Sequence, residues 1–111
     1  MALQIAKPTT AVASGPLPDG IVAMSPAYPN PSISDVSLAF SLPVAMSVRL
    51  QVYDATGALV RTLANETLGP GRHEVSWEGR DARGRLAPSG IYYATLEAGA
   101  RKLIRKLVRV Y

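Results

Sequence analysis

The sequence contains no cysteine, which excludes disulfide bridges, thiolate zinc sites and cysteine nucleophiles together. His73 is the only histidine, so no second imidazole is available to build a zinc site around it. Charged residues make up 18% of the chain, and Pro, Gly or a charge interrupts every apolar run well before the ~20 residues that a membrane-spanning helix needs. We therefore expect no transmembrane segment.

The composition that is present suits one folded domain. Hydrophobic residues make up 48% of the 111 residues, enough to bury a single core. Six of the nine prolines fall within the first 31 residues, among Thr, Ser, Gly and Ala. We predict a Pro/Ser/Thr-rich linker or N-terminal extension over residues 1–20 and a folded domain over residues 21–111. The start lacks the basic and continuous apolar segments of a signal peptide.

The domain shows the two-residue hydrophobic period of β-strands. In VSLAFSLP, apolar residues alternate with smaller ones until Pro43, which cannot donate a hydrogen bond to a sheet. We expect this segment to be the first edge of a sandwich. The predicted inward residues of this and the later strands are Val36, Leu38, Phe40 and Leu42; Val48, Leu50 and Val52; His73, Val75 and Trp77; and Tyr92, Ala94 and Leu96.

Turn-forming residues separate these segments, with the short spacing typical of all-β sandwiches. Asp54 to Gly57 predicts the turn of a hairpin that returns from Leu59 to Leu63. Asp81 to Gly90, rich in Asp, Gly, Pro and Ser, predicts a long connecting loop.

The last segment, residues 101–111, fits two structures. Its apolar residues are spaced as in a basic amphipathic helix. Against this, no N-cap residue precedes it, and EAGARK is typical of a hairpin turn at Gly99. We favour a strand and keep the helix as the alternative.

Five segments together resemble one family. YPNP, LAFSLP, VRLQVYDATGALVRTL, GRHEVSWEGRDARGRLAPSGIYYATLEAG and RKLIRKLV resemble, in order and spacing, the type A C-terminal sorting domain of the type IX secretion system. They are also similar to the related immunoglobulin-like domain of the flagellar hook-capping protein. The resemblance covers about residues 26–110. It implies an all-β, immunoglobulin-like or fibronectin III-like antiparallel β-sandwich of about seven strands.

The resemblance also implies a place in the cell and a recognition site. The domain would be the C-terminal part of an exported protein that passes through the periplasm, is recognised by outer-membrane secretion machinery and ends secreted or at the cell surface. The residues that match the family's recognition features are Tyr28, Pro29, Asn30 and Pro31 in YPNP; Asp81, Gly84 and Gly90 in the connecting loop; and Lys102, Lys106 and Arg109 in the last segment.

The residues alone support a plainer role for YPNP. Pro29 and Pro31 restrict the backbone and would deliver the chain to the following strand at a fixed angle, with Tyr28 over the edge of the sheet.

No residue pattern predicts catalysis. His73 shares the inward face of its strand with Trp77, which is typical of a packed histidine with one hydrogen bond. The acidic residues are scattered at turns and solvent-facing positions, without the spaced oxygen ligands of a calcium loop, and Asp81 is best explained as a turn residue. We expect no catalytic residues, no metal site, no cofactor and no enzymatic activity.

Positive charge is concentrated at the end of the chain. The formal net charge is +4, and the last segment holds five of the twelve cationic residues: Arg101, Lys102, Arg105, Lys106 and Arg109. Cations on an edge strand discourage aggregation, and they also suit docking to an acidic partner or an anionic surface; the two roles are compatible. Nucleic-acid binding is disfavoured, because the segment lacks interleaved exposed aromatics and a helix-turn-helix pattern.

Two functions remain open. The first is a non-enzymatic C-terminal module that is recognised for secretion and surface attachment. The alternative is a structural subunit or interaction module of an extracellular assembly, of hook-capping or appendage type, with self-assembly by strand addition. Carbohydrate binding would need a strip of exposed aromatics, for which Tyr53 and Tyr93 are scattered candidates.

Overall fold

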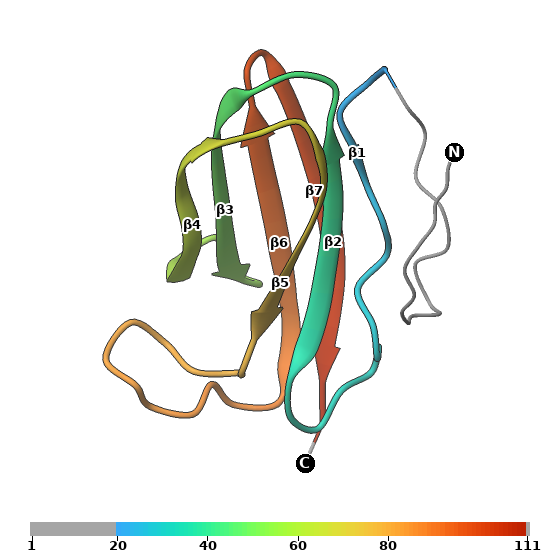
Figure 1. The fold of residues 1–111 in the computed structure, drawn as a ribbon. Helices are drawn as coiled ribbons and strands as arrows, with labels where there is room; N and C mark the ends of the chain where they lie inside the picture. The colour runs from blue at the N-terminus through green and yellow to red at the C-terminus, as the bar shows by residue number, and fades with distance from the viewer. Residues whose placement is uncertain (1–19, 111) are drawn as a thin grey trace.

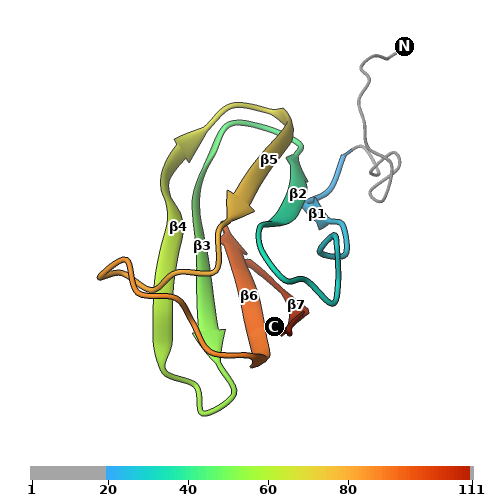
Figure 2. The same ribbon diagram turned by 90° about the horizontal axis from the view of Figure 1, so that it is seen from below.

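The computed structural model describes residues 20–110, which form two antiparallel sheets packed face to face (Figures 1 and 2). The seven strands are β1 (Ala23–Met24), β2 (Val36–Leu42), β3 (Met46–Asp54), β4 (Leu59–Leu68), β5 (Gly71–Trp77), β6 (Gly90–Ala98) and β7 (Arg101–Arg109). One sheet has the order β1-β2-β5 and the other β4-β3-β6-β7. The predicted all-β sandwich is confirmed. The extension predicted for residues 1–20 lies, apart from Gly20, outside the described residues.

The last segment is a strand, as favoured from the sequence. β7 pairs with β6 along its whole length, from Ala98 opposite Arg101 to Gly90 opposite Arg109. Gly99, with φ of 59°, makes the predicted turn. β7 therefore forms one edge of the four-stranded sheet.

The expectation that residues 36–42 form the first edge is wrong. β2 lies between β1 and β5, because the two residues of β1 pair with Ser41 and Phe40 on its outer side. A strand of two residues is too short to produce a hydrophobic period, so the sequence pattern did not reveal it.

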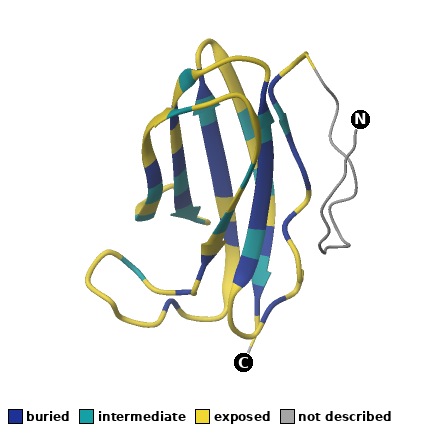
Figure 3. Ribbon diagram, viewed as in Figure 1, coloured by how far each residue is buried: buried dark blue, intermediate teal, exposed yellow. Residues whose placement is uncertain are grey.

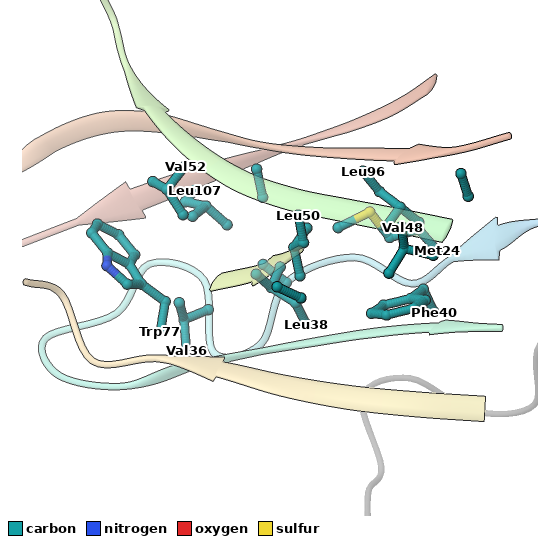
Figure 4. Packing of buried hydrophobic residues seen from close by; sticks show 14 of the residues in the cluster. Met24, Val36, Leu38, Phe40, Val48, Leu50, Val52, Trp77, Leu96 and Leu107 are labelled. Carbon is teal, nitrogen blue, oxygen red and sulfur yellow. The ribbon is translucent and has the colours of Figure 1, made fainter. Parts of the chain in front are cut away.

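The predicted inward residues form the core between the sheets (Figure 3), except that Val75 is partly buried against it and His73 is outside the cluster. The largest fully buried side chains include Trp77, Phe40, Leu38, Leu50 and Leu96. Figure 4 shows Trp77 at one end of this cluster and Phe40 toward the other. Burial of each such side chain contributes about 1.5 to 3 kcal/mol, so the alternating pattern supplies the main stabilisation of the fold.

His73 is packed as its pattern predicts. Its ring stacks on Phe40 with the centroids 5.5 Å apart, and its Nε2 lies 2.7 Å from the carbonyl oxygen of Gly69. The side chain is half-buried at the rim of the core.

Candidate recognition site

The YPNP segment lies directly against the edge of β7. The Asn30 side chain makes two hydrogen bonds to that strand: Nδ2 donates to the Lys106 carbonyl at 2.8 Å, and Oδ1 accepts from the Val108 amide at 2.8 Å. The carboxamide thus satisfies a donor and an acceptor of the edge strand, as a neighbouring strand would.

Two residues after Asn30, the backbone of Ser32 also pairs with the end of the chain. The Ser32 amide donates to the Val108 carbonyl at 2.8 Å, and the Val110 amide donates to the Ser32 carbonyl at 2.9 Å. On its other side the segment pairs with β2, where Tyr28 and Ser37 exchange two backbone hydrogen bonds. Residues 28–32, here called the clamp, therefore join β2 of the three-stranded sheet to β7 of the four-stranded sheet. The peptide bonds before Pro29 and Pro31 are both cis.

Arg109 occupies a different environment from the one expected. The sequence predicts an exposed cation at the end of a basic run, and this is wrong, because Arg109 is only 2% exposed. Its guanidinium lies 5.5 Å from the centre of the Trp77 ring and donates from Nη1 to the Ser34 carbonyl at 3.1 Å. Nε donates to the Ala87 carbonyl at 3.4 Å. Arg109 thus connects β7 to the chain after the clamp and to the connecting loop.

Gly79 makes room for this arginine. It has φ of +74°, and a Cβ at this position would overlap three atoms of the Arg109 guanidinium. The Gly79 carbonyl accepts from the Ala87 amide at 2.8 Å, which closes the base of the connecting loop. Glycine is therefore required here for both its backbone angle and its lack of a side chain.

Strand geometry divides the basic run into two sets. Successive side chains of a strand point to opposite faces, so Arg105 and Arg109 point toward the interior and Lys102 and Lys106 point outward. The half-buried Arg105 donates to the carbonyls of Ile104, at 3.1 Å, and Met24. It spans the seam between β7 and β1, and it covers a carbonyl of the β7 edge that the clamp does not reach.

The connecting loop is fixed by its aspartate. Asp81 Oδ1 accepts hydrogen bonds from the amides of Arg83, at 2.9 Å, and Arg85, at 3.0 Å. The hydrogen bond from the Arg85 amide, then that from the Arg83 amide and the charges of both arginines, lower the pKa of Asp81 below 3.8 despite some desolvation. Gly84 adopts φ of +83° and donates back to the Asp81 carbonyl. Asp81 is therefore a turn residue, as predicted.

The two aspartate turns share a sequence pattern that we did not predict from the sequence. DATGAL at residues 54–59 and DARGRL at residues 81–86 share one pattern, and their aspartates make the same bonds to the amides two and four residues ahead. The Thr56 hydroxyl is the largest cause of the lowered pKa of Asp54. The second turn packs against β4, where the Ala82 amide donates to Val60.

The structure brings together only some of the residues predicted for recognition. Asn30 and Pro31 lie beside the end of β7, and Gly90 pairs with Arg109. Lys102 lies at the opposite end of β7, across from Glu97. The Tyr28 side chain is 55% exposed beside β2.

Residues 20–110 contain neither a cluster of metal ligands nor a membrane-spanning helix. No group of three His, Cys, Asp or Glu side chains is positioned there to hold a metal ion. That part of the chain also contains no helix long and apolar enough to cross a bilayer.

Comparisons with known proteins identify related domains. The model of the FlgD Ig-like domain matches residues 32–102. A sequence comparison with curated proteins found no significant match.

Solved structures share the fold. They include latent dimeric PorU of Porphyromonas gingivalis, with a TM-score of 0.60 and 18% identity over 85% of this chain and 10% of PorU. PorZ of the same organism, an essential surface component of its type-IX secretion system, gives 0.56 and 21% over 81% of this chain and 11% of PorZ. FlgD of P. aeruginosa gives 0.53 and 24% over 67% of this chain and 60% of FlgD. The chain thus spans about a tenth of the length of PorU and PorZ.

Proposed function

Because this chain belongs to the FlgD Ig-like domain family, we propose that it is a non-enzymatic module of an exported protein, recognised for secretion across the outer membrane and for surface attachment. One observation carries the proposal: the clamp, the connecting loop and β7 are joined through Asn30 and Arg109. These are the segments in which the family resemblance predicts recognition.

The joined segments form a surface with a fixed shape. Asn30 and Arg105 satisfy edge groups of β7, and Arg109 holds the strand against Trp77. A partner that binds this end pays little entropy to order it, because the segments are already held in place. Lys102 and Lys106 remain on the outer side of the ordered strand and supply the charge that an acidic receptor would contact.

The size of the structural relatives supports an attached module. PorU and PorZ are about ten times longer than the region that this chain matches, so in both a domain of this fold is part of a much larger chain. PorZ is a component of the type-IX secretion system, which motivates the choice of that route here.

A fusion experiment tests the proposal. The full 111-residue chain is attached to the C-terminus of a periplasmic reporter enzyme, in a bacterium with a functional type IX system and in a strain that lacks the outer-membrane translocon. We expect the reporter at the cell surface or in the medium only in the first strain. A folded reporter that stays in the periplasm of both strains would contradict sorting.

A matched pair of variants tests the recognition site in the same assay. Asn30→Ala removes both side-chain bonds to β7, whereas Asn65→Ala changes an exposed asparagine on β4. We expect export to fall for the first variant and to remain unchanged for the second. Equal export would show that the clamp is not part of the signal.

The family match favours a second candidate function. In a structural module of an extracellular assembly, the domain would contact neighbouring subunits, and FlgD of P. aeruginosa shares the fold over 60% of its length. Under this alternative the fused reporter stays in the periplasm, and the purified chain forms oligomers in sedimentation experiments.

A further inference from the structure

The two outer faces of the sandwich have different chemistry. On the three-stranded sheet, the residues of outward parity on β2 and β5 are small or polar: Ser37 and Ser41 on β2, Arg72, Glu74 and Ser76 on β5, and the buried Ala39 opposite Glu74. On the four-stranded sheet, several outward residues are large and apolar: Leu59 is 54% exposed, Ile104 51%, Ile91 41% and Tyr93 36%. A stable sandwich does not need large apolar residues on an outer face, because the first sheet has small or polar residues at its outward positions.

The apolar residues of the second face are contiguous. Tyr53 lies opposite Leu59 on one side and Tyr93 on the other, and Tyr93 lies opposite Lys106. Residues directly opposite in antiparallel strands have Cβ atoms about 5 Å apart, so these side chains form one continuous row. The adjoining pairs Thr95 with Ile104 and Ile91 with Val108 extend it, and we call this surface the tyrosine face: Tyr53, Leu59, Ile91, Tyr93, Ile104 and Val108.

A hollow and two cations accompany this surface. A shallow depression on this surface is lined by the turn at residues 54–57 together with Tyr53, Tyr93, Thr95, Ile104 and Lys102. Neither Lys102 nor Lys106 forms an ion pair with another residue of the described range 20–110. Glu97, which lies opposite Lys102, is bound instead by Arg49 at 2.7 Å. The margin of the tyrosine face along β7 is therefore positively charged.

We propose that the tyrosine face is a docking surface for an acidic segment of a partner protein that presents aromatic or aliphatic side chains beside its carboxylates. The apolar row would take the partner's apolar side chains, and Lys102 and Lys106 would take its carboxylates. The proposal rests on the proposed function in that it names the chemistry of the partner. A second copy of this chain fits poorly, because each copy carries a net charge of +4 and presents the same two lysines.

Binding of synthetic copolymers to the purified full chain tests this surface. The probe is a random Glu/Tyr copolymer; the controls are poly-Glu and a Lys/Tyr copolymer. We expect the Glu/Tyr copolymer to bind at least about tenfold more tightly than either control, because only it offers both charge and apolar groups, and tenfold corresponds to about 1.4 kcal/mol. Amide NMR shifts should map to residues of β6 and β7 around Tyr93 and Ile104.

Three variants localise the effect. Reversing both lysines, Lys102→Glu with Lys106→Glu, and replacing the apolar group by Ile104→Thr, which keeps a β-branched side chain, should each weaken binding by about tenfold. Arg72→Glu reverses a charge on the opposite outer face and should leave the localised binding unchanged. Thermal melts confirm that each variant is folded.

Several outcomes would overturn the proposal. These are equal binding of poly-Glu, shifts that map to the three-stranded sheet, binding that survives Ile104→Thr, or a dimer through this face in sedimentation experiments. The reporter assay is independent of the copolymer assay: export without copolymer binding overturns only the tyrosine face, and binding without export overturns only the sorting function.

Discussion

Replacing Gly79 by alanine tests the connection between the connecting loop and β7. The change has two costs. At φ of +74° a side chain is strained by about 1 to 2 kcal/mol. The new methyl group also overlaps the guanidinium of Arg109, which must leave its position over Trp77 and its bonds to the carbonyls of Ser34 and Ala87.

The structure sets the size of the second cost. A cation over an aromatic ring contributes about 0.5 to 2 kcal/mol, and each hydrogen bond from a charged group about 1.5 to 3, less at the longer of the two distances. Because a displaced arginine regains part of this from water, we expect Gly79→Ala to lower the free energy of unfolding by about 3 to 5 kcal/mol in total. Domains of this size are stable by only about 5 to 15 kcal/mol, so the loss is large.

A second glycine supplies the control. Gly57 has φ of +90° but no heavy atom within 4 Å of a Cβ, so Gly57→Ala carries the backbone strain alone. Both changes affect the unfolded chain equally, and this contribution cancels in their difference. Urea unfolding followed by the fluorescence of Trp77, the single tryptophan, measures both variants. Equal destabilisation would refute the role assigned to Arg109.

Two further predictions concern the clamp and the aspartate turns. Asn30→Ala should lower the free energy of unfolding by about 1 to 2 kcal/mol relative to Asn65→Ala, because two hydrogen bonds to β7 are lost; urea unfolding measures the difference, and equal values would contradict the clamp. Because the fold lowers the pKa of Asp54 and Asp81 below 3.8, their contribution is complete above that pH and is lost as the pH falls through the lowered values; the double variant with Asn at both positions should therefore show a shallower loss of stability in urea titrations between neutral and acidic pH, and an unchanged slope would contradict it.

The sequence was sufficient for most of the sandwich. Alternation at Val36 to Leu42 and at Val48 to Val52 identified strands because one face of each is buried. Asp54 identified a turn because its side chain bonds to nearby amides. These features are local, so a local pattern reveals them.

Features that depend on distant contacts were not predicted. Arg109 has the inward parity of Leu107, but nothing near it in the sequence shows that Trp77 and Gly79 form a space for its guanidinium. The same limit applies to Asn30, which bonds to a strand more than seventy residues later. We therefore predicted one exposed cluster of positive charge, whereas the alternation of side chains along β7 places Arg105 and Arg109 inward and the two lysines outward.

Native-state hydrogen exchange tests most directly whether the clamp, the connecting loop and β7 form one unit. Three backbone amides report on these segments. The Ser32 amide donates from the clamp to Val108 of β7, and the Val108 amide donates back to the Asn30 side chain. The Ala87 amide donates to the Gly79 carbonyl at the base of the connecting loop. We expect all three amides to exchange with one common opening free energy, close to that of global unfolding, and to lose protection together in Gly79→Ala. Exchange of Ser32 or Ala87 that is orders of magnitude faster than that of Val108 would show that the segments open independently and would contradict the account.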